Sequence, residues 1–167
     1  LVGSPADDTY QLDPGPGSVI TLVDPAGSDT LDFSTAQGVT VTLAETATST
    51  GTQSSGTAVD SDGGLVLIGS PTEPAASTAV ETVLGSETGQ NVLSVTQTDA
   101  RTSLTDPAPQ FTDITLVGGQ AGNTFVVDAN DERTGDAQTV PPANYGDFTL
   151  VGSPADDTYQ LDPGPGS

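Results

Sequence analysis

The first eighteen residues of this chain return as its last eighteen without a single substitution. Residues 1–18 and residues 150–167 both read LVGSPADDTYQLDPGPGS, at an offset of 149 residues. Such a repeat restricts the fold, because each period must end in a shape that the start of the next can continue. We expect residues 1–149 to be one tandem period, a β-rich repeat unit, and residues 150–167 to be the start of the next. A designed chain, or a circularly permuted fragment with a duplicated end, would carry the same duplication.

A shorter pattern recurs inside the period. In it, an Asp or Asn is followed two and four residues later by large, mostly apolar side chains. Apolar residues at alternate positions line one face of a short strand, and an Asp or Asn side chain can bond the backbone of the turn before it. We expect this turn–strand unit at five places, which begin at Asp8, Asp29, Asn91, Asn123 and Asp157.

Further strands are predicted between these units. Five segments are rich in Val, Thr, Leu and Ile, which favour strands; they are 19–23, 39–43, 65–68, 80–84 and 114–117. Helix signals are poor, and one or two helical turns are expected within 75–83. Loops are expected at 44–64, a Ser/Thr/Gly-rich segment that could carry O-glycans, and at 128–146. The DPGPG segment at 13–17 predicts a rigid turn. The sequence therefore predicts an all-β fold.

Composition excludes several classes of function. The chain has 23 acidic residues against two Arg, a formal net charge of -21, so it cannot neutralise the phosphates of a nucleic acid. No apolar run approaches the ~20 residues that a membrane-spanning helix needs. The absence of Cys and His removes disulfides, thiol nucleophiles and imidazole bases. Paired carboxylates alone can hydrolyse glycosides, but aromatic residues that would stack on a sugar are scarce, so we expect no enzyme and no catalytic residues.

Three segments resemble the haemolysin-type (RTX) repeats of large extracellular bacterial tandem-repeat and surface proteins. They are GSPADDTYQLD, GGQAGNTFVVDAND and VDPAGSDTLDFSTAQGVTVTL. The family unit is G-G-x-G-x-D-x-U-x, where U is a large apolar residue. This resemblance implies a right-handed parallel β-roll whose turns hold calcium. Carried over residue by residue, it implies calcium ligands at Asp7, Asp8, Asp29, Asp156 and Asp157.

The chain also departs from the family pattern. Ser4 and Ala6 stand where the family has Gly, and Asn123 stands where it has Asp. The units do not follow one another directly, although family calcium sites need consecutive turns. Turn capping by the Asp and Asn side chains therefore remains an alternative to calcium binding. Asp60 and Asp62 form a separate, weaker candidate, since DxDG also occurs in ordinary turns.

These observations predict a β-solenoid, or parallel β-roll-like repeat unit; the alternative is an antiparallel β-sandwich tandem domain. Two-residue hairpin signals are scarce, which favours the solenoid. We expect a structural repeat of an extracellular filament, adhesin stalk or surface-layer protein that assembles with itself by end-to-end stacking of β rungs. The partners expected are copies of the same period and glycans, with neither nucleic acid nor membrane insertion. The alternative function is a calcium-binding RTX-type module of a secreted protein.

Overall fold

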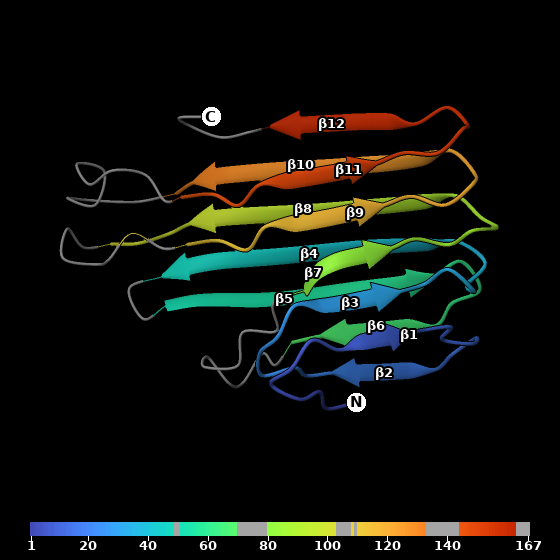
Figure 1. Cartoon of the computed structure of the whole chain (residues 1–167), viewed down its shortest axis with the longest axis horizontal. Helices are drawn as coiled ribbons and strands as arrows, with labels where there is room; N and C mark the ends of the chain where they lie inside the picture. The colour runs from blue at the N-terminus through green and yellow to red at the C-terminus, as the bar shows by residue number, and fades with distance from the viewer. Residues whose placement is uncertain (49–50, 70–79, 103–107, 109, 133–143, 163–167) are drawn as a thin grey trace.

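The computed structural model describes residues 1–48, 51–69, 80–102, 108, 110–132 and 144–162. These residues form an all-β structure of two sheets (Figure 1). The five-stranded sheet contains, in spatial order, β1 (Thr9–Gln11), β3 (Asp29–Asp32), β7 (Val80–Leu84), β9 (Ile114–Val117) and β11 (Phe148–Val151). The seven-stranded sheet contains β12 (Thr158–Asp162), β10 (Asn123–Asp131), β8 (Asn91–Asp99), β4 (Val39–Thr48), β5 (Gly51–Asp60), β6 (Leu65–Ile68) and β2 (Val19–Leu22). In these ranges, no helix is long and apolar enough to cross a membrane.

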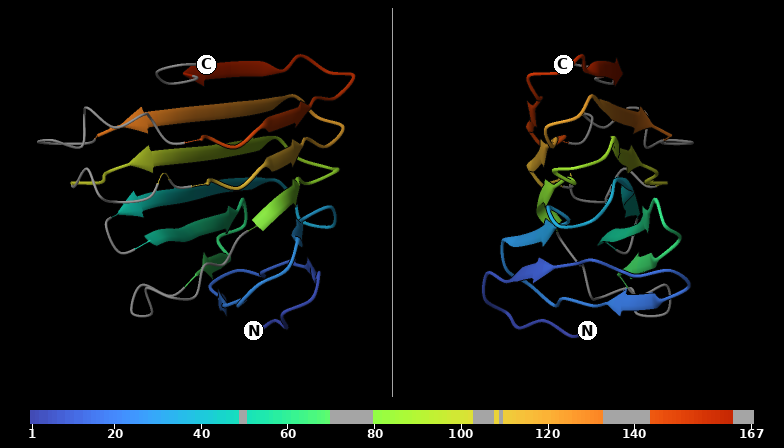
Figure 2. Two further views of the ribbon diagram at one scale, coloured as in Figure 1. Left: turned by 60° about the vertical axis from the view of Figure 1, so that its left-hand side comes forward. Right: turned by 90° about the vertical axis from the view of Figure 1, so that its right-hand side faces the viewer.

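The chain changes sheet after nearly every strand. Among the described strands, only the run β4–β5–β6 stays in one sheet, and its two pairings are antiparallel. The other eight pairings between described strands are parallel. Figure 2 shows the resulting stack, with β1 and β2 towards one end and β12 at the other. This pairing differs from the mainly antiparallel hairpins that the sandwich alternative predicts, although both arrangements have two sheets.

Neighbouring strands are paired so that side chains of one kind form rows through the stack. In the five-stranded sheet one inward row is Tyr10, Leu31, Val83, Leu116 and Leu150. In the seven-stranded sheet the inward rows include Val41, Leu93, Phe125 and Tyr159. The rows meet between the sheets and form one apolar core. Each fully buried side chain of this kind contributes about 1.5–3 kcal/mol to folding.

The predicted strands are confirmed, whereas the loop expected at 44–64 is wrong for 44–48 and 51–60 and confirmed for 61–64. Segments 65–68, 80–84 and 114–117 coincide with β6, β7 and β9. Residues 44–48 instead complete β4 and residues 51–60 form β5, and the two strands are antiparallel, paired from Val39↔Asp60 to Thr48↔Gly51. Residues 49–50 lie outside the described residues. Thr favours extended backbone, and Gly56 lies so close to Leu43 that an added Cβ would be 2.8 Å from Leu43 Cδ2. A segment of small and polar residues can therefore be a central strand.

Three other local predictions have mixed outcomes. The helical turns expected within 75–83 are wrong for 80–83, which lie in β7, while 75–79 lie outside the described residues. Of the loop expected at 128–146, residues 128–131 extend β10, and 133–143 lie outside the described residues. The turn expected at 13–17 is confirmed between β1 and β2, where Gly17 has a φ of 73°.

Candidate functional site

The turns that connect the sheets lie on two opposite edges of the stack. Turns that lead into β8, β10 and β12 lie at the right of Figure 1, and the turn that leads into β3 lies at the left. The five Asp and Asn residues that share one sequence pattern are divided between these edges. Asp8 and Asp29, with Asp24 beside them, form what we call the acidic edge; Asn91, Asn123 and Asp157 form the amide edge.

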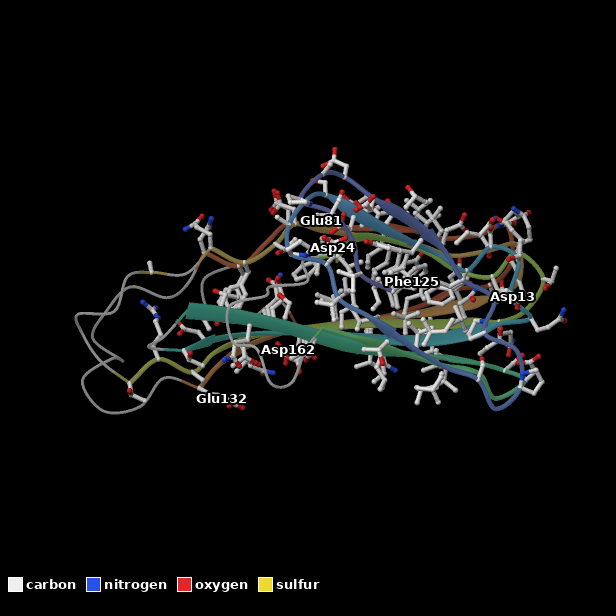
Figure 3. The ribbon with its side chains drawn as sticks, turned by 90° about the horizontal axis from the view of Figure 1, so that it is seen from below. Asp13, Asp24, Glu81, Phe125, Glu132 and Asp162 are labelled. Atoms are coloured by element: carbon white, nitrogen blue, oxygen red, sulfur yellow. The ribbon has the colours of Figure 1, made fainter. Side chains whose placement is uncertain are left out.

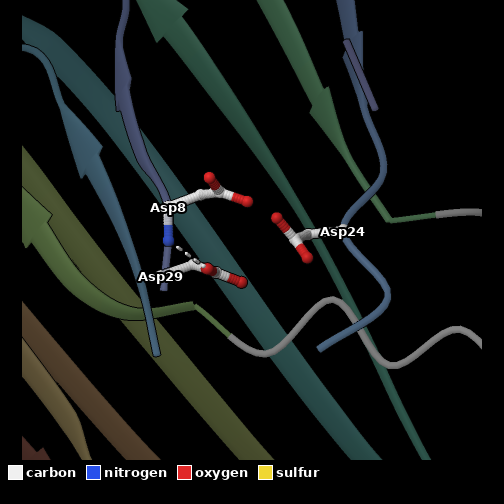
Figure 4. A group of neighbouring side chains, drawn as sticks. All are labelled: Asp8, Asp24 and Asp29. Atoms are coloured by element: carbon white, nitrogen blue, oxygen red, sulfur yellow. Dashed lines mark hydrogen bonds between the residues drawn. The ribbon is translucent and has the colours of Figure 1, made fainter. Parts of the chain in front are cut away.

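Three carboxylates meet at the acidic edge (Figure 4). One oxygen from each of Asp8, Asp24 and Asp29 lies within 4.8 Å of the others. Asp24 and Asp29 are 0% and 1% exposed. The Asp8 amide donates to Asp29 Oδ1 at 3.0 Å, and the Tyr10 hydroxyl donates to Asp24 Oδ2. Asp29 Oδ2 is buried and has no hydrogen-bond partner among the described residues.

Local turn geometry places these groups together. The amide and hydroxyl of Ser4 donate to Asp8 Oδ2 at 2.8 and 2.9 Å, which closes the first turn. The second turn packs on it through Gly27, whose φ is 132° and whose added Cβ would lie 2.6 Å from the Ala6 carbonyl oxygen. Asp7 Oδ1 accepts the Ser28 amide at 2.9 Å between the two turns. A residue with a side chain at position 27 would separate the turns and their carboxylates.

Burial and mutual repulsion dominate the electrostatics of this edge. Burial raises the pKa of Asp29, and the charges of Asp24, Asp8 and Asp7 raise it further. Burial also raises the pKa of Glu81, whose Oε2 accepts the Asp29 amide at 2.6 Å. In the view of Figure 3, Glu81 and Asp24 lie towards one edge of the stack and Asp13 lies towards the opposite edge. In contrast, the Ser4 amide and hydroxyl lower the pKa of Asp8.

The donor set of the acidic edge fits a hard cation. Calcium binds six to eight oxygens, with carboxylates prominent among them, and the edge offers three carboxylates and an unpartnered buried acceptor. The ion pair that the structure describes, Arg101 with Asp99, lies outside this cluster. Asp8, Asp24 and Asp29 would bind the calcium ion, and its charge would offset the repulsion between the three carboxylates.

Only some of the metal ligands expected from the sequence come together. Asp8 and Asp29 meet, whereas Asp7 accepts a backbone hydrogen bond beside them. Asp156 is exposed, and Asp157 lies on the other edge despite the identical sequence around it. The sequence comparison missed Asp24 as a ligand; its signal was that Asp24 replaces the Gly found five residues upstream in other units. Asp60 Oδ1 accepts the Asp62 amide at 3.2 Å in the turn between β5 and β6.

Side-chain amides and backbone groups donate hydrogen bonds along the amide edge. The side-chain nitrogen of Asn91 donates to Asn123 Oδ1 at 2.8 Å, and that of Asn123 donates to Asp157 Oδ1 at 2.9 Å. Asp157 Oδ2 accepts the Ser153 amide at 2.7 Å, which lowers the Asp157 pKa. Here the Asp and Asn side chains cap turns, the alternative that sequence analysis left open.

A polar cluster inside the stack was missed by sequence analysis. Glu45 on β4 accepts the Gln97 side-chain nitrogen at 2.8 Å and the Thr112 hydroxyl at 2.6 Å. Gln97 also donates to the Thr112 carbonyl and accepts the Gly146 amide. These partners are far apart in sequence, so no local pattern marks them. Because its groups are mutually bonded, the cluster fixes segments 111–114 and 144–147 against the long strands.

The last feature is the contrast between the two copies of the repeated segment. Leu12 is 2% exposed in the first copy, whereas the equivalent Leu161 in β12 is 59% exposed. Tyr159, equivalent to half-buried Tyr10, stacks on Phe125 but remains 48% exposed. No protein-family model, curated protein or solved structure matches the chain. The acidic edge and the exposed end of the stack therefore carry the functional argument.

Proposed function

We propose that this chain is a structural repeat of an extracellular filament, adhesin stalk or surface-layer protein. In this proposal it is a β-solenoid whose successive periods stack end to end. The support is the alternation of strands between two sheets and the in-register parallel pairing, since both let rows of like residues continue along one axis. Because such a stack buries each coil only against its neighbours, it gains stability as periods are added.

The observation that carries the proposal is the unequal burial of identical residues. The same Tyr and Leu are covered in the first copy, which is followed by β2 and β3, and uncovered in β12. An exposed apolar edge strand is a template for pairing with more backbone. A further period placed on β12 would cover Leu161 as Leu12 is covered. The net charge of -21 would keep a long polymer dispersed through self-repulsion.

Solution scattering from a chain of two periods, residues 1–149 followed by residues 1–167, tests this function. We expect one rod of constant cross-section, lengthened by ~4.8 Å for each added strand level. We also expect a single unfolding transition with a higher midpoint than that of the 167-residue chain. Two lobes joined by a flexible hinge, with the midpoint of the shorter chain, would contradict end-to-end stacking.

The second candidate is a calcium-binding module of a secreted protein. It is favoured by the unpartnered, buried oxygen of Asp29 within a cluster of three carboxylates. Metal binding of this kind is coupled to folding. Circular dichroism with and without EDTA separates the candidates. An unchanged β signal after chelation contradicts calcium-dependent folding, and collapse to coil contradicts a scaffold that folds without metal.

A further inference from the structure

The two copies of the repeated segment have the same local structure. The Ser4 amide donates to Asp8 Oδ2 at 2.8 Å, and the Ser153 amide donates to Asp157 Oδ2 at 2.7 Å. In both copies the Ser hydroxyl also accepts the amide two residues on, at 3.3 and 3.1 Å. The tyrosine hydroxyl lies against the glycine of the turn in each copy. The turn is therefore fixed by its own sequence and forms wherever the segment is placed.

The copies nevertheless lie in opposite sheets. Residues Thr9–Gln11 form β1 of the five-stranded sheet, whereas Thr158–Asp162 form β12 of the seven-stranded sheet. Val151 belongs to β11 of the five-stranded sheet, whereas its equivalent Val2 pairs with Val23, directly after β2 of the seven-stranded sheet. Among the described strands, the chain changes sheet nine times from β1 to β12, and an odd number of changes places the two copies in different sheets.

We propose that the end formed by β11 and β12 accepts the next period with the two sheets exchanged, so that two sequence periods make one structural repeat. This inference rests on the end-to-end stacking proposed above. Its occupant is residues 19–33 of a second copy of the period. The first copy shows the contact, because Thr9, Tyr10 and Gln11 pair with Thr30, Leu31 and Asp32. Transferred to β12, the same pairing places the second period's β3 in the seven-stranded sheet.

The alternative is a junction in which each strand of the second period lies in the same sheet as its equivalent in the first, and existing contacts oppose it. Such a junction would detach β12 from its five paired residues in β10 and β11 from its four in β9. It would also break both hydrogen bonds from Asn123 to Asp157 Oδ1, at 2.8 and 2.9 Å. A junction with exchanged sheets keeps all of these contacts. It also adds to β12 the pairing that β1 makes with β3 in the first copy.

Exchange has two structural consequences. Asp157 corresponds to Asp8, so the second period's Asp24 and Asp29 would complete a carboxylate cluster around it, and a candidate cation site would lie at every junction. The strands β5 and β6 give one sheet two more strands than the other within a period. When the sheets exchange, each sheet receives the two extra strands in alternate periods, so over two periods both sheets gain the same number of strands.

Cysteine pairs in the two-period chain test the exchange, because the natural sequence contains no Cys. Paired residues of adjacent parallel strands are ~4.8 Å apart, within reach of a disulfide. In the exchanged junction, residue 158 lies between Thr124 and residue 30 of the second period. We expect T158C to form a disulfide with T124C in one variant, and with a Cys at residue 30 of the second period in another. The pair T124C/T158C in the 167-residue chain, where Thr124 and Thr158 are paired, is the positive control.

Other outcomes overturn the proposal in distinguishable ways. If the sheets keep their identity, residue 158 leaves β10 and joins the five-stranded sheet beside β9, so T158C would react with T115C instead. That result would reject exchange and leave end-to-end stacking intact. Reaction with neither T124C nor T115C would reject stacking as well. Reaction with T124C but not with residue 30 of the second period would show that β12 accepts no further strand, which also rejects the proposal.

Discussion

Two identical stretches of sequence, residues 1–13 and 150–162, occupy different environments in this molecule. The first copy meets Asp24 and Asp29 at the acidic edge, and the second meets Asn123 at the amide edge. Leu12, which precedes β2 and β3 in the chain, is buried, whereas Leu161 is exposed. The Asp of each copy caps its own turn, so the difference shows that neighbours decide whether that Asp also joins a carboxylate cluster. Matched substitutions in the two copies can therefore separate local from stacking effects.

The largest expected contrast is between Leu12→Ala and Leu161→Ala. Removing the buried Leu12 side chain leaves a cavity and should lower the free energy of unfolding by about 2–5 kcal/mol. Leu161→Ala removes an exposed side chain and should cost less than about 0.5 kcal/mol. Urea unfolding followed by circular dichroism measures both. In the two-period chain, the Leu161 substitution should become as costly as the Leu12 one. A Leu161→Ala effect that stays small there would argue against burial at the junction.

The second contrast converts the amide edge towards an acidic one. Asn123→Asp removes a donor from Asp157 Oδ1 and from the Ala121 carbonyl, and it places a second charge beside Asp157. We expect a loss of about 3 kcal/mol in the free energy of unfolding. Asp156→Asn, a charge change at an exposed neighbouring position, is the control and should have almost no effect. An Asn123→Asp variant as stable as the natural chain would mean that the hydrogen bonds from Asn123 to Asp157 contribute little to the free energy of unfolding.

The third contrast concerns calcium. If the acidic edge binds it, calcium at one hundred times its dissociation constant should stabilise the chain by about 2.7 kcal/mol. Asp24→Asn should abolish this gain, since it removes one charge of the cluster and keeps a side chain of the same size. Asp156→Asn should retain it, because Asp156 is exposed outside the cluster. Calorimetric titration and thermal unfolding in calcium and in EDTA provide the readouts. A gain that survives Asp24→Asn would place the ion elsewhere.

Much of the fold was predictable from local patterns, because β6, β7 and β9 are rich in Val, Thr, Leu and Ile, which favour strands. The β4–β5 hairpin was not, since the inward-facing Glu45 is satisfied by Gln97 and Thr112, which are distant in sequence. The division of the Asp and Asn residues between two edges was also hidden. It depends on how many times the chain changes sheet between units, and a strand that stays in its sheet, such as β5, alters that count without a local signal.

The smallest expected effect is on the pH dependence of stability without calcium. The pKa of Asp29 is raised in the folded chain, so folding favours its protonated form. Stability should therefore rise as the pH falls from neutral towards the unfolded-state pKa of 3.8. The pKa of Asp8 is lowered, so the stability it contributes is present above 3.8 and lost below it. The raised pKa of Asp29 and the lowered pKa of Asp8 have opposite effects, and together they predict a maximum in the free energy of unfolding at mildly acidic pH.

Asp29→Asn isolates the first of these contributions. The variant keeps an oxygen for the Asp8 amide and removes the buried charge, so it should be more stable than the natural chain at neutral pH by about 1 kcal/mol. It should also show a smaller rise in stability on mild acidification, because only the contribution of Glu81 remains, while keeping the fall at lower pH. Urea midpoints measured across this range in EDTA give both parts of the curve. If the variant retained the full rise, the titrating group would be Glu81, whose pKa is also raised by burial, and the comparison of edges would then centre on that residue.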